Sequence, residues 1–272
     1  MSIKNIAALV SVGRHPVSGE ARHCRNDSLA MGIGLALTKK INAISTSAGT
    51  TNKTSLRVMH AGNPDNAALK DYLALGAKNI DVIALTAECN IIESLANELT
   101  NTDLILTGSR AENGQDSGLV PYLLAERLSF SLVANALEVK LTHEGLEVLQ
   151  FLPKGKRRSV IVQFPAVVIV HPLAPVELRH AYSQQVMGSV NQQPSLRFTP
   201  VIDQDNGLQW QKQSTLRKPI KLKARENKSG HARMLSATVS ENKGGAVVID
   251  GNSVEKAQVI LRYLREHRLI NF

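Results

Sequence analysis

The sequence predicts an α/β fold: a Rossmann-like, three-layer parallel sheet with an added β region and an extended C-terminal arm. Three observations support this fold class. Over roughly the first 130 residues, short apolar runs alternate with helical patterns, which is typical of βαβ units that build a parallel sheet. Residues 132–170 then carry longer β-type runs, and residues 171–230 are rich in Pro, Gln and Ser with little periodicity.

Each strand and helix of the first part is indicated by its own pattern. The expected strands are 6–12, 58–61, 81–85 and 103–107, and the expected helices are 28–40, 64–75 and 91–99. Gly76 directly follows the second helix and is a suitable C-terminal stop for it. The runs ALEVKL, LEVLQFL, SVIVQF and AVVIV that follow are expected to add strands or a hairpin to the sheet.

The same patterns predict three regions along the chain. Residues 1–190 form the α/β domain, and residues 191–230 form an extended linker or arm. Residues 231–272 form a C-terminal unit with a strand at 246–250 and an amphipathic helix at 253–268. We expect this unit to pack on the main domain or on a partner subunit.

The composition narrows the classes of partner. The net charge is +9, and much of it lies in two basic stretches, 154–158 and 217–228. Aromatic residues make up only 4% of the chain, so the stacking surface that single-strand binders use is missing. We therefore interpret the charge as a solvated basic face or a protein contact, and we expect no nucleic-acid partner.

The cysteines and the first residues bear on the compartment. Cys24 and Cys89 are far apart and belong to no CxxC or Cys/His pattern, which favours a reducing, cytoplasmic compartment and no zinc site. The apolar run near residue 1 is too short for a membrane span. We interpret it as the first strand and expect no direct membrane insertion.

Residues 103–128 carry the richest pattern for chemistry. A buried strand ends at Thr107, Gly108 permits a sharp turn, and a polar loop leads into a helix. If Ser117 or Gly118 caps this helix, Pro121 falls in its first turn. Backbone N–H groups from about residue 115 to residue 120 would then point outward and could hold a phosphate. The alternative is an ordinary polar loop with a good N-cap.

Two other strand ends could complete a nucleotide site. SVGRHP at 11–16 places Gly13 and Arg14 after the first strand, and HAGNP at 60–64 places Gly62 after another strand. Each turn alone is a weak signal, because glycine after a strand is usually only a turn. Three strand ends at one edge of a parallel sheet make a ligand site a stronger prediction.

The sequence lacks the motifs of several enzyme classes. It has no GxxxxGK[ST], no GxGxxG before the first helix and no GxSxG. The eight histidines are scattered without metal spacing, and none is paired in sequence with a nucleophile. We therefore expect no metal, no catalytic residues and no enzymatic activity.

These motifs together resemble the beta subunit of electron-transfer flavoprotein. Four segments follow the family's order and spacing: SVGRHP at 11–16, the run at 60–83, GSRAENGQDSG at 108–118 with VPYLLAERL after it, and FPAVVIV at 164–170. The resemblance covers residues 3–187 and the closing helix. It implies a heterodimer in which an alpha subunit holds most of an FAD. The beta subunit binds a structural AMP or, in electron-bifurcating relatives, a second FAD.

The resemblance also implies a role and a set of nucleotide contacts. Family members carry electrons from a flavin-dependent dehydrogenase to a quinone-linked acceptor, and the 1–190 region would be the nucleotide-binding domain. The contacts carried over by position are Ser11, Ala61, Gly62, Gly108, Asn113, Gly114, Gln115, Asp116, Ser117, Gly118 and Leu119. The alternative function is a nucleotide-binding sensor or regulatory module without a redox role. A nucleotide-hydrolysing or adenylylating enzyme is a further one, but it would need a phosphate loop that SVGRHP does not provide.

Three departures from the family pattern are visible. The Asn-Pro-Phe stretch before the first helix is unrecognisable at 24–27, and a basic stretch at 154–158 replaces an acidic one. In RHAYSQQVM at 179–187, Ser183 and Gln184 stand where the family's partner-recognition loop has Leu-Pro. We expect the dehydrogenase to dock here through Tyr182, Ser183, Val186 and Met187 instead.

Overall fold

The computed structural model describes residues 3–15, 17–47, 53–85, 90–112, 117–193, 229–231, 234, 250–266 and 269–270. It separates into two compact units, Met1–Asn206 and Gly207–Phe272. The first unit holds the sheet and most helices, and the second holds one long helix.

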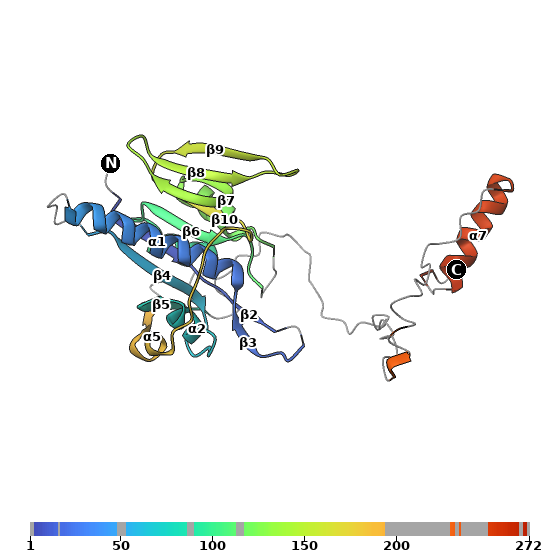
Figure 1. The fold of residues 1–272 in the computed structure, drawn as a ribbon, viewed down its shortest axis with the longest axis horizontal. Coiled ribbons are helices and arrows are strands. Elements are labelled where there is room, and N and C mark those ends of the chain that lie inside the picture. The colour runs from blue at the N-terminus through green and yellow to red at the C-terminus, as the bar shows by residue number, and fades with distance from the viewer. Residues whose placement is uncertain are drawn as a thin grey trace. The chain divides into compact units, whose positions relative to one another are not determined.

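A nine-stranded sheet forms the centre of the first unit, in the order β11-β5-β4-β1-β6-β10-β7-β8-β9. Its strands from β11 to β7 are parallel, and β8 and β9 add an antiparallel edge. The sheet contains β1 (Asn5–Leu9), β4 (Ser55–Gly62), β5 (Asn79–Ala84), β6 (Leu104–Gly108), β7 (Ser131–Leu141), β8 (Leu146–Phe151), β9 (Arg157–Val162), β10 (Ala166–Val170) and β11 (Ser189–Gln193). The predicted α/β fold with an added β region is confirmed (Figure 1).

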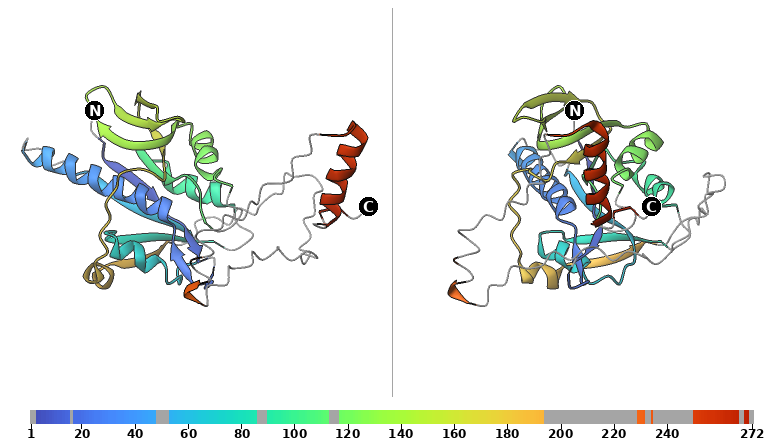
Figure 2. Two further views of the ribbon diagram at one scale, coloured as in Figure 1. Left: turned by 45° about the vertical axis from the view of Figure 1, so that its right-hand side comes forward. Right: turned by 90° about the vertical axis from the view of Figure 1, so that its right-hand side faces the viewer.

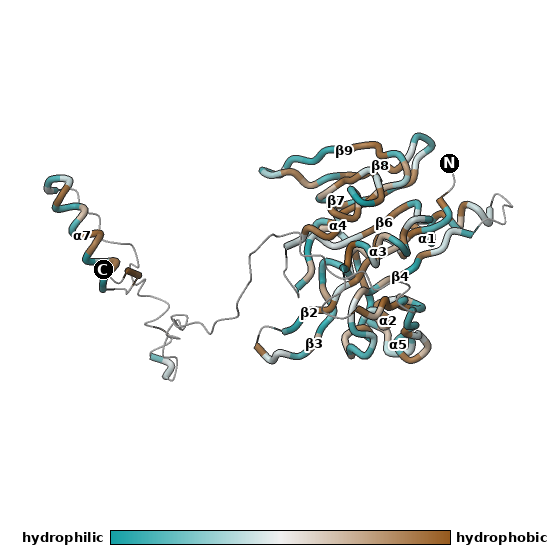
Figure 3. Tube along the Cα trace, turned by 180° about the vertical axis from the view of Figure 1, so that it is seen from behind, coloured by the Kyte–Doolittle hydropathy of each residue, from teal (hydrophilic) through white to brown (hydrophobic). Residues whose placement is uncertain are grey.

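Helices cover both faces of the sheet. On one face, α1 (Arg25–Ser47) packs Ile33 against Ile6 and Leu104, and α2 (Leu69–Ala74) lies beside it. On the other face, α3 (Ile91–Leu99) and α4 (Val120–Leu128) lie over the sheet, where Leu124 packs with Ile105. Alternate strand residues point to opposite faces, so the buried strands are apolar at nearly every position. Figure 2 shows α1 and α4 on opposite sides of the sheet, and Figure 3 shows the apolar strands between them.

The strand order places a topological switch point at β1. The chain runs from β1 to β4 and β5 on one side, and then crosses to β6 on the other side of β1. The carboxyl ends of β1, β4 and β6 therefore lie side by side at one edge of the sheet. In open α/β sheets this is the position where ligands bind. A short antiparallel hairpin of β2 (Val12–Arg14) and β3 (Ala21–His23) follows β1 at this edge.

The low periodicity of residues 171–230 predicts no regular element there, and this is wrong for residues 171–193. Residues 171–193 contain α5 (Tyr182–Met187) and the edge strand β11, which pairs with β5 in the register Ser189↔Asn79. β11 reads SVNQQ and buries little, because an edge strand has a single neighbour and tolerates polar side chains. Residues 191–193 thus belong to the sheet, and the rest of the expected arm, 194–228, lies outside the described residues.

The second unit contains α7 (Ser253–Glu266), which matches the predicted helix 253–268 over these residues, and residues 267–268 lie outside the described residues. It begins with a reciprocal cap, in which Asn252 Oδ1 accepts from Glu255 N at 2.9 Å and Glu255 Oε2 accepts from Asn252 N at 3.0 Å. Of the predicted strand 246–250, only Asp250 is among the described residues.

The basic stretch 154–158 forms part of the turn between β8 and β9 and the first residues of β9, at the edge of the sheet opposite β11. Arg157 Cζ lies 4.6 Å from the centre of the Phe151 ring, and Arg158 Nε donates to Gln150 Oε1 at 2.9 Å. No helix within the described ranges is long and apolar enough to cross a membrane.

Candidate functional site at the ends of the central strands

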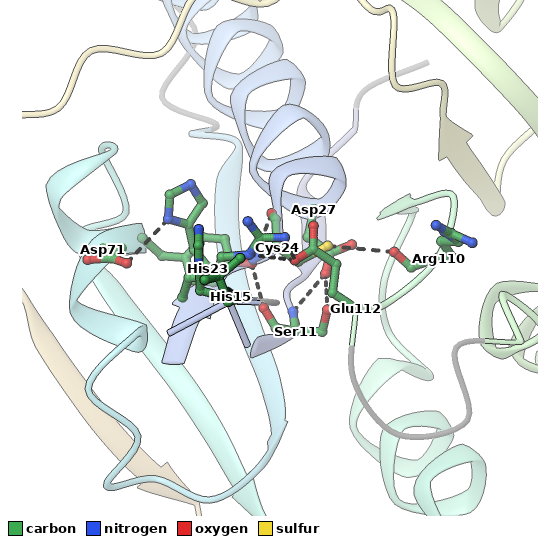
Figure 4. Close-up of polar contacts among 11 residues, drawn as sticks. Ser11, His15, His23, Cys24, Asp27, Asp71, Arg110 and Glu112 are labelled. Carbon is green, nitrogen blue, oxygen red and sulfur yellow. Dashed lines mark hydrogen bonds and ion pairs between the residues drawn. The ribbon is translucent and has the colours of Figure 1, made fainter. Parts of the chain in front are cut away.

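A buried carboxylate occupies the switch point. Asp27, in the first turn of α1, accepts hydrogen bonds from Ser11 N at 2.8 Å and from the Ser11 hydroxyl through Oδ2. Its other oxygen, Oδ1, accepts from Gly108 N at 3.1 Å. Asp27 therefore links the segment after β1 to the end of β6 and to the start of α1 (Figure 4). We call Ser11, Cys24, Asp27, Tyr72 and Gly108 the strand-end cluster.

Burial dominates the electrostatics of Asp27. Only 6% of the residue is exposed, and burial raises its pKa to about 6 although the hydrogen bonds from Ser11 and Gly108 act in the opposite direction. Its place near the N-terminus of α1 also favours the charged form, because the helix dipole is positive there. Asp27 is therefore mostly ionised at neutral pH.

Tyr72 and Cys24 complete the strand-end cluster from the side of α2. The fully buried Tyr72 hydroxyl donates to Ser11 O at 2.6 Å and accepts from Cys24 N at 2.9 Å. The Cys24 thiol contacts Arg110 O at 3.6 Å, and burial, followed by the charge of Asp27, raises its pKa to about 11. Cys24 thus stays protonated at neutral pH and makes a poor nucleophile.

The loop after β6 folds back on its own start. A Cβ on Gly108 would fall on Asp27 and within 2.8 Å of the Asn26 carbonyl carbon, so only glycine fits here. At the far end of the loop, Gly118 has a φ of +67°, and a Cβ there would lie 2.9 Å from Ser109 O. The N-terminus of α4 therefore lies close to the end of β6.

The start of α4 differs from the predicted cap. The helix begins at Val120 with Leu119 as N-cap and no side-chain cap, so neither Ser117 nor Gly118 is the capping residue. The Ser117 hydroxyl instead accepts from Leu119 N at 3.4 Å, just outside the helix. Pro121 does lie in the first turn, as expected, because the missing N–H has no helical partner there.

The β2–β3 hairpin is tied to this loop. Arg22 donates to Glu112 Oε2 through Nε at 2.9 Å and through Nη2 at 2.7 Å. Glu112 lies against Gly13, where a Cβ would come within 2.7 Å of the Glu112 side chain. The hairpin, the loop and the strand-end cluster thus form one connected polar network.

The end of β4 contributes a neutral histidine. His60 Nδ1 lies 2.8 Å from Val10 O, so Nδ1 carries the proton and donates, and Nε2 is left as an acceptor. Burial lowers the pKa of His60, which keeps the ring neutral. Nε2 faces the backbone of Gly62, where a Cβ would come within 2.7 Å.

The structure places the predicted nucleotide contacts as follows. Ser11, Ala61 with Gly62, and Gly108 lie at the adjacent ends of β1, β4 and β6. Ser117, Gly118 and Leu119 lead into α4, and residues 113–116 lie outside the described residues. The N–H groups of Ser11 and Gly108 donate to Asp27, which the sequence interpretation did not include.

Sequence reasoning also missed His60 and the Arg22–Glu112 pair. Nothing local marks these residues, since Arg22 and Glu112 are 90 positions apart. The one usable signal was an acidic residue, Asp27, directly before the small and mostly apolar run at 28–37 of α1.

The predicted docking residues lie on α5, which packs against α2. The Ala181 N–H donates to Ala74 O at 2.8 Å and the Ser189 N–H to Lys78 O at 3.2 Å, so both ends of α5 are fixed. Tyr182 is 72% exposed, Val186 66% and Met187 87%. They form an exposed apolar surface on a short helix whose two ends are held by backbone hydrogen bonds.

Among the described residues there is no group of three or more His, Cys, Asp or Glu side chains that could hold a metal.

Comparison with known proteins gives the family. No protein-family model matches the chain. The sequence is 33% identical to the electron transfer flavoprotein subunit beta of Chromohalobacter salexigens, over 97% of this chain and 95% of that protein. Since the likeness runs through the parallel sheet, the strand ends and the closing helix, the chain belongs to the electron-transfer flavoprotein beta subunit family.

Proposed function

We propose that this chain is the beta subunit of a heterodimeric electron-transfer flavoprotein, with a structural AMP bound at the ends of β1, β4 and β6. The alpha subunit would hold most of the FAD, and a flavin-dependent dehydrogenase would supply the electrons for a quinone-linked acceptor. The observation that carries the proposal is the 33% identity over 97% of the chain. The switch-point geometry supports it, because nucleotides bind at this position in doubly wound sheets.

The residues at the three strand ends fit the adenosine part of AMP. Ala61 and Gly62 are small and let a ligand approach the backbone closely, and His60 Nε2 is an acceptor for an amino or hydroxyl group. Thr107 Oγ1, at the end of β6, is buried and has no hydrogen-bond partner among the described residues. An orphaned hydroxyl of this kind is consistent with a polar partner that completes the site.

The phosphate of AMP would bind at the loop that leads into α4. The N–H groups of Ser11 and Gly108 already donate to Asp27, so they do not fit a phosphate. The N-terminus of α4 carries a positive dipole end and lies beside Ser109. We assign the phosphate to residues 113–119, with Ser117, Gly118 and Leu119 as its described members.

The electron-carrier role requires little chemistry from the chain itself. The bound flavin would supply the redox chemistry, and the protein's part is to hold its partner subunit and the nucleotide rigidly. The hydrogen bonds that join Ser11, Asp27, Tyr72 and Gly108 suit such a scaffold. The proposed subunit is therefore no enzyme, and its proposed compartment is the cytoplasm.

The dehydrogenase would dock on α5. Aromatic and methionine side chains on a fixed helix are common anchors in protein interfaces. Tyr182, Val186 and Met187 would take over the role of the family's Leu-Pro, while Ser183 would lie within the contact.

The test is to co-express the chain with its proposed alpha subunit and to identify every released nucleotide by mass spectrometry. We expect a yellow heterodimer that contains FAD and AMP in equal amounts and is bleached by a dehydrogenase. A colourless monomer that binds a nucleotide would support the sensor function instead. A heterodimer with no adenylate would remove the AMP site from the proposal.

A further inference from the structure

β9 forms one edge of the nine-stranded sheet, and β8 is its strand partner among the described residues. The pairing runs without interruption from Leu146↔Val162 to Phe151↔Arg157, so β9 is a regular strand of six residues. The backbone groups on its outer side meet no other described strand (Figure 1). A regular edge of this kind is a template for the addition of a further strand.

The usual protection of such an edge covers only part of β9. Sheets commonly protect their edge strands with charges, bulges or a very short length. In β9 the charges are confined to the first two residues, Arg157 and Arg158, and the other four residues read SVIV. Ile161 in this second part is 51% exposed. Uncharged, β-branched residues favour strand pairing, so this part of the edge is suited to a partner, and the two arginines select which partner it accepts.

Arg157 and Arg158 are held in place by uncharged groups. Arg157 Cζ lies 4.6 Å from the centre of the Phe151 ring, and this ring stacks on His171 with 4.1 Å between the ring centres. Arg158 Nε donates to Oε1 of Gln150, a residue only 9% exposed that itself donates to the backbone of β7. Neither guanidinium forms an ion pair with a described carboxylate. Both therefore keep their charge and lose little freedom on binding, and a fixed guanidinium can bind both oxygens of a carboxylate.

The turn before β9 adds two lysines at the same end of the edge. Lys154 and Lys156 are both exposed, and the Leu152 N–H donates to Lys156 O at 3.1 Å across the turn. Lys154 has a φ of +60°, a left-handed conformation that Gly or Asn adopts more readily than Lys. The start of β9 is therefore strongly positive, and an anionic partner fits it best.

The alternation of side chains along β9 favours an extended polypeptide as this partner. Successive residues of a strand point to opposite faces of a sheet, so Arg157 and Arg158 lie on opposite faces. An added strand with two consecutive carboxylates would place one carboxylate beside each arginine, as cross-strand ion pairs. A flat membrane surface could face only one of the two arginines. A second copy of the chain carries the same net charge of +9 and is repelled.

We propose that β9 is a docking edge for an acidic, extended segment of a partner protein. The segment adds a strand beside β9, pairs two consecutive carboxylates with Arg157 and Arg158, and covers Ile161. Its backbone hydrogen bonds supply affinity, and its carboxylates supply selectivity. β10, β7 and β8 lie between β9 and β6, so this docking is independent of the proposed nucleotide site.

The experiment titrates a fluorescein-labelled peptide, VTVEEVTV, with the full-length chain co-purified with its proposed alpha subunit, and follows fluorescence anisotropy at low salt. The peptide reads the same in both directions, so its two glutamates can meet the arginines in a parallel or an antiparallel pairing. The matched peptide VTVQQVTV removes both charges. We expect the acidic peptide to bind at least about tenfold more tightly than the glutamine peptide, which corresponds to about 1.4 kcal/mol.

The double variant Arg157→Gln with Arg158→Gln should reduce this preference by about tenfold. Its control is Lys39→Gln with Lys40→Gln, which removes two exposed positive charges from α1 and should leave the preference unchanged. A version of the acidic peptide with alternate backbone nitrogens methylated keeps both carboxylates but cannot pair along one side. We expect it to bind at least about tenfold more weakly than the unmethylated peptide.

Four results would overturn the inference. Equal affinities of the unaltered protein for the acidic and the glutamine peptide would do so, even if the double arginine variant did not fold, and so would binding of neither peptide. Equal binding of the methylated and unmethylated acidic peptides would show that charge alone attracts the peptide and that β9 gains no strand. Binding to vesicles of phosphatidylglycerol and phosphatidylcholine, lost in the double arginine variant and without any binding of the acidic peptide, would assign the basic edge to a membrane surface instead.

Discussion

Replacing Asp27 by Asn should change how the stability of the protein depends on pH. Burial raises the pKa of Asp27 to about 6, above its ordinary value of 3.8, so the folded chain binds this proton more strongly than the unfolded chain does. The stability that Asp27 contributes is therefore full below pH 3.8 and is lost as the pH rises through about 6. The Asn side chain has no such proton.

The magnitude follows from these two pKa values. Because the pKa of Asp27 is about 6 in the folded state and 3.8 in the unfolded state, the free energy of unfolding should fall by about 1.4 kcal/mol between about pH 5 and about pH 7.5. We expect the free energy of unfolding of the unaltered protein to fall by this amount relative to the Asp27→Asn variant. The absolute difference at any one pH also contains the hydrogen bonds that Asn cannot make.

Urea unfolding of the co-expressed heterodimer, at fixed protein concentration and at several pH values, measures this difference. Glu93→Gln is the control, because a hydrogen bond from Arg127 lowers the pKa of Glu93. The contribution of Glu93 is lost only as the pH falls below 4.5, so the difference between the unaltered protein and Glu93→Gln should stay constant between about pH 5 and about pH 7.5. If the difference between the unaltered protein and Asp27→Asn stayed constant over this range, the reasoning about the buried carboxylate would be refuted.

Three further substitutions test the site and the docking surface. Gly108→Ala should lower the free energy of unfolding by about 1–3 kcal/mol in urea titrations, because the added Cβ would clash with Asp27 and Asn26. Its control is Gly230→Ala, which should leave the free energy of unfolding unchanged because the added Cβ would have no atom within 4 Å. Tyr72→Phe should lower the free energy of unfolding by about 1–3 kcal/mol in the same titrations, since Ser11 O and Cys24 N lose the tyrosine hydroxyl as a partner. Its control is Tyr122→Phe, which should have little effect because Tyr122 is 47% exposed. Met187→Ala should raise the KM of the dehydrogenase for the carrier by about fivefold in a dye-reduction assay, the effect of losing about 1 kcal/mol of binding. An equal effect from Ile44→Ala, which is also exposed, would argue against docking on α5.

The sequence predicts those helices and strands whose pattern comes from residues close together in the chain. The helix predicted at 91–99 is α3 to the residue, because its apolar period is regular and Asn90 accepts from Ile92 N and Glu93 N as a cap. The edge strand β11 escaped prediction, because a polar strand has no period-2 signal and is defined by its pairing with β5. Its only inward-packing apolar residue, Val190, gives too little pattern.

The sequence predicts which strand ends meet at the candidate site, but not which side chains form contacts there. Strand ends that converge at a switch point follow from the order of strands and helices, so Ser11, Gly62 and Gly108 could be placed at one edge. The contacts of Asp27 could not be predicted, since its partners Ser11 and Gly108 are 16 and 81 positions away. Such long-range pairs arise from the packed fold, and no spacing in the sequence indicates them.

The donor set explains why a carboxylate lies at the switch point in spite of its desolvation. Three donors converge there, the N–H and hydroxyl of Ser11 and the N–H of Gly108. A carboxylate is acceptor-only and can satisfy all three, whereas an amide would turn one of its own N–H groups toward a donor. Without an internal acceptor, the same donors would attract an anion from solution. The contacts between β1, β6 and α1 at this edge of the sheet therefore depend on one side chain, Asp27.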